Sequence, residues 1–273
     1  MIARALAAWL AAAALAAGAA EPVAFVADLQ GNANIAGQGK ASFLAELVPG
    51  ARLLLGTGAT VAVTFAATGT EFTLNGPGEF VVAATEVKAE RGPAPRKRTV
   101  GATADPAVIA RASRTANASL RMRGINPRAA PAIALQYPVD TRVVTLQPTL
   151  RWRGDAAGEP FAVTLTDADG KPVWHGQVKP AMARPPVKLA ASTAYRWTVM
   201  TSAGARAEGR FETLSPEAVA RAEKARAGAR TFPGRVLHAF VLQDIGATQD
   251  AREAWAALAR ERPDLPELEA LAR

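Results

Sequence analysis

The sequence predicts a mainly β protein with a helical segment at its C-terminal end, and three observations carry this prediction. Short runs of alternating apolar and polar residues, separated by glycines, fill the stretch 50–82. A second region of such runs spans about 134–214. From Ser215 onward the apolar residues recur at helical spacing. Period-two alternation is typical of half-buried strands, and a 3.6-residue period is typical of helices.

The stretch 50–82 predicts a β-meander in which each strand buries one face and exposes the other. Its apolar positions alternate within every run, and glycine-containing turns separate the runs at 56–58, 68–69 and 76–78. Glycine suits such turns because it has no Cβ to clash at positive φ.

The residues before this stretch complete a small β domain that we expect to span 21–90. Residues 23–35 predict an opening strand with a turn at Gly31 and Asn32, and residues 38–48 predict a further strand or a short turn. A motif of glycines and alternating hydrophobic residues runs through the domain. It consists of Leu47, Gly50, Leu53 and Gly56, followed by the pattern V.V.F...G..F.L.GPGEF.V from Val61 to Val82.

This motif resembles the FecR domain, the periplasmic β module of iron-dicitrate sensor proteins, over Val23 to Lys88. The resemblance implies a periplasmic receiver of a signal from an outer-membrane transporter. In that family one membrane helix couples the module to a cytoplasmic segment that restrains a sigma factor. Here only Met1 to Arg4 precede the apolar run, so we expect that cytoplasmic segment to be absent.

The N-terminus has the three parts of a secretory signal peptide. Arg4 is followed by an apolar run from Ala5 to Ala17 and by small residues before Glu21. We therefore expect a cleavable signal peptide over 1–20, a mature protein in the periplasm or cell envelope, and no membrane span after cleavage. An uncleaved N-terminus anchored in the inner membrane is the alternative. The absence of cysteine excludes disulfides, lipoprotein attachment and thiol chemistry.

Positive charge is concentrated in the segment 91–133, which we interpret as a basic, proline-rich linker with a short helix from Asp105 to about Ala112. The segment from Arg91 to Ala130 contains nine Lys or Arg residues and one acidic residue. Such clusters attract anionic polymers, lipid head groups or acidic protein surfaces, although solvated linker residues are the alternative interpretation. The export signal argues against a nucleic-acid partner. The candidate contacts for an anionic partner are Arg91, Arg96, Lys97, Arg98, Arg121 and Arg123.

Residues 134–214 predict a β-sandwich of short strands, with a hairpin that turns at 167–170. Trp152 lies on an early strand, and Leu189 is followed by Tyr195 and, two positions on, by Trp197. With these residues the region resembles a fibronectin type III or related immunoglobulin-like module. That resemblance implies a spacer or binding module without catalytic residues, in which the Tyr195 hydroxyl bonds the backbone at a corner.

Residues 215–273 predict three helices, which cover 216–230, 234–245 and 248–262. Ser215 followed by proline and glutamate is a strong helix start. The last two helices are similar to a single tetratricopeptide-type hairpin. Because one such hairpin cannot bury both of its faces, we expect it to dock onto the sandwich or onto another protein.

No pattern in the sequence predicts catalysis, a cofactor or a metal site. The two histidines, His175 and His238, fall in different predicted modules, and we interpret them as an exposed strand residue and a partly buried helix residue. Asp167 and Asp169 lack the later glutamate of a calcium loop and lie where a hairpin needs turn formers.

Together these features predict an exported, non-enzymatic envelope protein that binds or scaffolds through protein–protein interaction. Two alternatives stay open. One is a binder of anionic cell-wall or surface polysaccharide through the basic linker. The other is a signal-receiving regulator of envelope transport without the usual sigma-restraining segment. The sequence does not indicate the oligomeric state.

Overall fold

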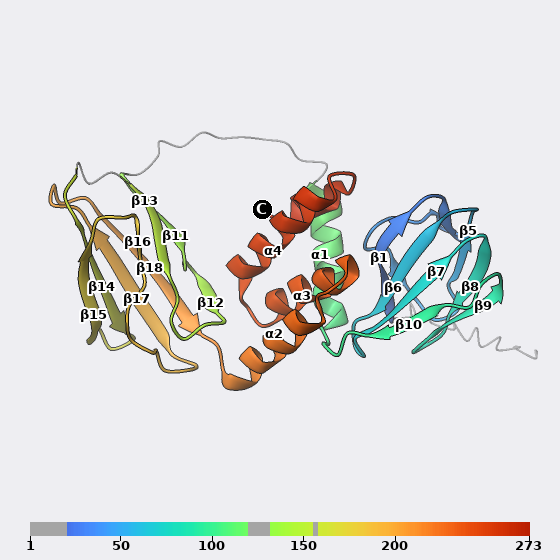
Figure 1. Ribbon diagram of the computed structural model, residues 1–273, viewed down its shortest axis with the longest axis horizontal. Helices are drawn as coiled ribbons and strands as arrows, with labels where there is room; N and C mark the ends of the chain where they lie inside the picture. The colour runs from blue at the N-terminus through green and yellow to red at the C-terminus, as the bar shows by residue number, and fades with distance from the viewer. Residues whose placement is uncertain (1–20, 120–131, 155–157) are drawn as a thin grey trace, which may run out of the picture.

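The computed structural model describes residues 21–119, 132–154 and 158–273. Two β domains lie at opposite ends of the molecule with helices between them, as Figure 1 shows. We call these parts the N-terminal β domain, the helical layer and the sandwich domain. The predicted fold class, mainly β with C-terminal helices, is confirmed. The predicted signal peptide falls outside the described residues.

The N-terminal β domain consists of two five-stranded antiparallel sheets. Their apolar faces enclose one core, in which Leu53, Val63 and Phe80 are fully buried. The first sheet has the order β10 (Arg96–Thr99), β7 (Thr70–Asn75), β6 (Thr60–Phe65), β1 (Ala24–Gln30), β4 (Glu46–Leu47). The second has the order β3 (Gly39–Lys40), β2 (Ala33–Ile35), β5 (Arg52–Leu55), β8 (Gly78–Val82), β9 (Val87–Arg91).

The strands over 50–82 form where the alternation predicts them, but they do not pair as a simple meander. Strand β5 pairs with β8, while β6 and β7 pair with each other in the opposite sheet. The chain crosses between the sheets in two adjacent turns, one between β5 and β6 and the other between β7 and β8. They approach so closely that a Cβ on Gly76 would lie 2.1 Å from the Gly56 carbonyl oxygen, and this contact requires glycine.

The first part of the basic segment, which the sequence predicts as a linker, instead belongs to edge strands, and this corrects the prediction for residues 91–99. Strand β9 ends at Arg91, and β10 pairs with β7 in the other sheet. Pro93 and Pro95 fall in the turn between these strands, where a missing backbone donor is tolerated. The cationic side chains are accommodated because an edge strand of a sheet needs little apolar surface.

Within the described ranges five helices form the helical layer, and they come from both sides of the sandwich domain in the sequence. Ser215 and Thr231 cap α2 and α3 by accepting hydrogen bonds from backbone N–H groups, and each cap is followed by proline in the first turn. The first helix is longer than predicted, and the last was not predicted. The helices are α1 (Pro106–Ser119), α2 (Pro216–Gly228), α3 (Phe232–Asp244), α4 (Thr248–Glu261) and α5 (Pro266–Leu271).

The helical layer covers the outer face of the first sheet, so β1 is buried on both of its faces. Ala24 and Val26 belong to the core between the sheets, whereas Phe25 and Ala27 belong to the core of the helical layer. The Phe25 ring meets the Phe240 ring of α3 edge to face, with centroids 5.6 Å apart. The expectation that each strand exposes one face therefore fails for this sheet.

The sandwich domain has a three-stranded and a five-stranded sheet around a third core. Trp152 and Trp197 lie at its centre with ring centroids 6.1 Å apart. The Tyr195 hydroxyl accepts a hydrogen bond from the Ala190 backbone N–H at 2.9 Å, which is the contact implied for this tyrosine. The sheets are β11 (Ile133–Tyr137), β13 (Leu150–Gly154), β16 (Met182–Ala183), and β12 (Thr141–Val143), β18 (Arg206–Thr213), β17 (Ala194–Met200), β14 (Phe161–Asp167), β15 (Pro172–Val178).

Candidate binding surfaces

Four of the six candidate anion contacts lie within the described residues, and these four do not share one role. Arg121 and Arg123 lie outside the described residues. Arg91, Arg96 and Lys97 are exposed at one corner of the N-terminal β domain, on the edge strands β9 and β10. No ion pair holds these three side chains within the part of the chain that the structure describes. They remain available to a partner.

Arg98 differs from its neighbours because it holds the helical layer to the N-terminal β domain. Its guanidinium pairs with Glu71 at 3.1 Å and donates to the Thr231 hydroxyl at 2.6 Å. Glu71 is buried, so its carboxylate needs this cation. Thr231 is the cap of α3. Arg98 therefore has a structural role, which removes it from the candidate contacts.

Strand β15 forms one edge of the five-stranded sheet and pairs with β14 alone among the described strands. His175 and Gln177 are exposed on it, as expected for His175. Trp174 is half-buried, and its ring lies over Gly176, where a Cβ would approach it to 2.5 Å. An unpaired sheet edge is a recognition surface for an extended peptide segment.

The turn before β15 is stabilised by Asp167, as the sequence predicts. Its Oδ1 accepts hydrogen bonds from the backbone N–H groups of Asp169 and Lys171, at 3.1 and 2.9 Å. Asp167 therefore stabilises the turn.

The joint between the sandwich domain and the helical layer is made by specific polar contacts. The Gln249 side chain in α4 accepts from the Val139 N–H and donates to the Gln136 carbonyl, both at 2.8 Å. Nearby, the Arg142 N–H donates to the Gly246 carbonyl at 3.1 Å. These contacts satisfy backbone groups of both parts, so they fix the orientation of one part relative to the other.

A cleft of about 280 Å³ opens at this joint. Its apolar wall includes Val144, Leu242 and Ala254, and its polar groups come from β11, α2, α3 and α4. Titratable side chains gather in it, and most of them are paired. Those that line it are Tyr137, Glu223, Arg226, His238, Asp250 and Glu253.

Asp250 is the carboxylate of this cleft that carries no ion pair within the described residues. Burial raises its pKa to about 6, while a hydrogen bond from the Tyr137 hydroxyl opposes that rise. Glu253, in contrast, pairs with Arg151, whose guanidinium carbon lies 4.9 Å from the centre of the Tyr137 ring. Burial, followed by the Asp250 charge, raises the pKa of Tyr137, so its phenol stays a donor.

His238 lies half-buried in α3, as expected from the sequence, and faces the same cleft. Burial and then the nearby Arg226 lower its pKa, so the imidazole is neutral at pH 7. Arg226 itself pairs with Glu223 at 2.7 Å. The cleft thus combines two ion pairs, one neutral imidazole and one uncompensated carboxylate.

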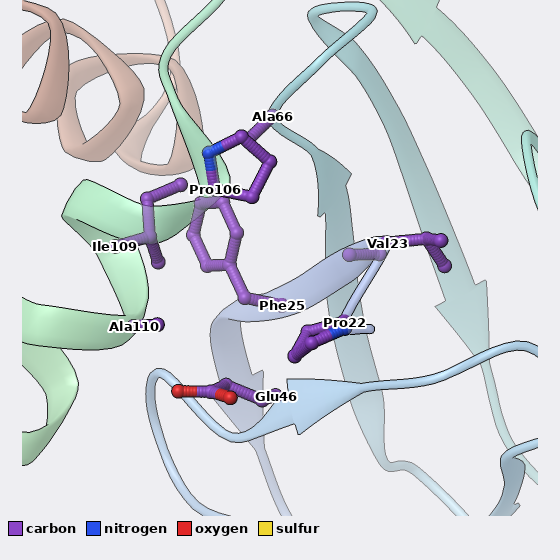
Figure 2. Close-up of a pocket in the computed structure, with 9 residues that line it drawn as sticks. Pro22, Val23, Phe25, Glu46, Ala66, Pro106, Ile109 and Ala110 are labelled. Carbon is purple, nitrogen blue, oxygen red and sulfur yellow. The ribbon is translucent and has the colours of Figure 1, made fainter. Parts of the chain in front are cut away.

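Figure 2 shows a second, smaller hollow between β1, β4 and α1, with the Phe25 ring, Pro106 and Ile109 around it. Its volume is about 10 Å³, which is no more than one water molecule requires. Its walls are mostly apolar. This hollow is a packing gap between the N-terminal β domain and the helical layer, not a ligand site.

The residues that the structure describes contain neither a metal-binding cluster nor a membrane-spanning helix. No group of three or more His, Asp or Glu side chains there is placed to hold a metal ion. No helix there is long and apolar enough to cross a membrane.

Sequence reasoning missed the joint and its cleft. Tyr137 and Asp250 lie far apart in the chain and belong to different modules, and neither is part of a recognisable motif. The one local signal was Asp250 in the first turn of a predicted helix, where an acid ordinarily complements the helix dipole.

Comparisons with known proteins give little further information. No protein-family model matches this chain, and no curated protein matches it. A solved structure, CopC from Methylosinus trichosporium OB3b, is similar over 30% of this chain and 93% of its own length, at 21% identity and a TM-score of 0.22. A likeness at this TM-score assigns neither a function nor a ligand to this chain.

Proposed function

We propose that this chain is an exported, non-catalytic protein of the bacterial cell envelope that scaffolds other proteins by binding them through its sheet edges. The observation that carries the proposal is the helical layer, which contacts both β domains and sets their relative orientation. The apolar faces of its helices pack into a core within the molecule. Partner proteins would therefore bind to the β domains, each of which has sheet edges.

The signal-peptide pattern over 1–20 and the FecR-like motif over 23–88 support the envelope location. The four strands over 52–82 fit a FecR-like module, and the Tyr195 corner contact fits a fibronectin-like one. A signal-receiving regulator would use the same surfaces.

The test is photo-crosslinking in cells at single positions of the full chain. A crosslinking amino acid at Gln177, on edge strand β15, should give a discrete protein adduct. The matched control is Arg196, which is exposed on the central strand β17 of the same sheet. No adduct at Gln177, and none at Lys88 on the edge strand β9, would overturn edge-mediated scaffolding.

A second candidate function is binding of an anionic cell-wall polymer. The observation in its favour is the exposed corner formed by Arg91, Arg96 and Lys97 without ion pairs among the described residues. Clustered exposed cations bind polyanions with an affinity that salt screens.

This second function is tested by co-sedimentation of the mature chain with isolated cell-wall sacculi over a salt series. Changing Arg91, Arg96 and Lys97 to glutamine should abolish salt-sensitive pelleting. A control variant with glutamine at Arg153, Lys171 and Lys179 changes the net charge equally and should pellet normally. Arg98 stays unchanged in both variants, because its loss would loosen the helical layer. Equal pelleting of the two variants would refute a specific corner site.

A further inference from the structure

The cleft at the joint holds one carboxylate that no described side chain pairs with. Glu253 pairs with Arg151 and Glu223 pairs with Arg226, whereas Asp250 forms no ion pair among the described residues. A partly buried carboxylate without a cation is unfavourable, because burial removes hydration that nothing replaces. A cation that entered the cleft would meet this charge directly.

The walls determine what kind of cation fits. Val144, Leu242 and Ala254 give the cleft apolar sides, and about 280 Å³ is enough for a molecule of a few carbon atoms. A bare metal ion would require several oxygen or nitrogen ligands, and no group of three or more His, Asp or Glu side chains in the described ranges is placed to supply them. The chemistry matches an apolar body that carries one ammonium group.

We propose that this cleft binds a small organic amine, with its ammonium group on Asp250 and its apolar part against Val144, Leu242 and Ala254. The neutral imidazole of His238 also lines the cleft and can accept or donate one hydrogen bond to a polar group of the ligand. The ligand would touch both the sandwich domain and the helical layer. Binding therefore ties the two parts of the scaffold together.

The groups that face Asp250 also set the pH range of binding. Tyr137 from β11, Glu253 from α4 and Arg151 from β13 act on its carboxylate. Burial raises the pKa of Tyr137, so its phenol keeps its proton throughout the neutral range. Protonation of Asp250 below pH 6 removes the charge that an ammonium group needs, so the amine should dissociate on acidification.

The experiment uses the mature chain, residues 21–273, with hexylammonium as the probe and 1-hexanol as its neutral counterpart. Calorimetric or NMR titration at pH 7.5 should give at least tenfold tighter binding of hexylammonium, and this advantage should vanish at pH 4.5. Bound hexylammonium should also lower the pKa of the Asp250 carboxyl, measured from its ¹³C shift. Equal binding of the two probes would overturn the proposal.

Three variants locate the site. Asp250→Asn, which removes the charge and keeps the size of the side chain, should reduce hexylammonium binding at least tenfold. Ala254→Leu, which fills the cleft, should weaken both probes. Asp169→Asn, the same chemical change in an exposed turn, should alter neither. Unchanged amine binding by Asp250→Asn, or by Ala254→Leu, would refute this site. The edge-crosslinking result is independent of either outcome.

Discussion

Replacing Asp250 by asparagine should stabilise the protein above pH 6 and leave its stability nearly unchanged below about pH 4. Burial raises the pKa of Asp250 from 3.8 to about 6. The folded state thus holds this proton more tightly than the unfolded chain does, and the ionised carboxylate opposes folding. The penalty is absent below the unfolded value, grows as the pH rises toward 6, and stays constant above it.

The size of this penalty follows from the difference between the two pKa values. One pKa unit corresponds to about 1.4 kcal/mol, so full conversion gives about 3 kcal/mol as an upper limit. Asp250 borders an open cleft, where solvent screens part of its charge. We therefore expect Asp250→Asn to gain about 1–2 kcal/mol at pH 8, or roughly 2–8 °C in Tm for a chain of this size.

Urea unfolding followed by tryptophan fluorescence at pH 8 and pH 4 measures the gain. The variant should unfold at a higher urea concentration at pH 8 with an unchanged slope, and it should match the parent protein at pH 4. Asp169→Asn in the exposed hairpin turn is the matched control and should show no difference at either pH. If Asp250→Asn were less stable at pH 8, the carboxylate would gain more from Tyr137 than burial costs it, and the argument would fail.

Three further predictions concern the contacts that hold the layers together. The guanidinium of Arg262 pairs with Asp28 of β1, and the side chain is 15% exposed. Arg262→Ala should lower the free energy of unfolding, measured with urea, by about 2–4 kcal/mol. A double-mutant cycle on Glu71 and Arg98 should give a coupling of about 1–3 kcal/mol, whereas additive effects would deny the pair a structural role. Tyr195→Phe, which removes the acceptor of a backbone N–H, should cost about 1–2 kcal/mol, and a neutral result in thermal unfolding would contradict the corner contact.

The local elements were predictable because their signals are local. Alternation over 50–82 and the cap at Ser215 depend on neighbouring residues, and the strands and α2 form there. Strand pairing was not predictable in the same way. Whether β5 pairs with β6 or with β8 depends on a close approach of Gly56 and Gly76, which are separated by two strands in the sequence.

The basic segment shows how tertiary context overrides composition. Prolines and arginines over 91–98 have the composition of a solvated linker. The buried Glu71 on β7 makes a strand at β10 favourable, since Arg98 supplies the cation that this carboxylate needs. The sequence predicts Arg98 as a binding residue because it belongs to a cluster of cations, and no local signal reveals its partner Glu71, which lies 27 positions away.

The organisation of the helical layer links the proposed scaffold to the proposed amine site. Helix α1 precedes the sandwich domain and α2 to α5 follow it, yet all of them share one core with Phe25 of β1. The sandwich domain is thus inserted into a unit that the N-terminal β domain completes. Its orientation depends on a joint that the α4 side chains of Gln249 and Glu253 help to make. Because Asp250 lies between those two residues, the proposed ligand on its carboxylate would act at the contact that fixes the orientation of the sandwich domain.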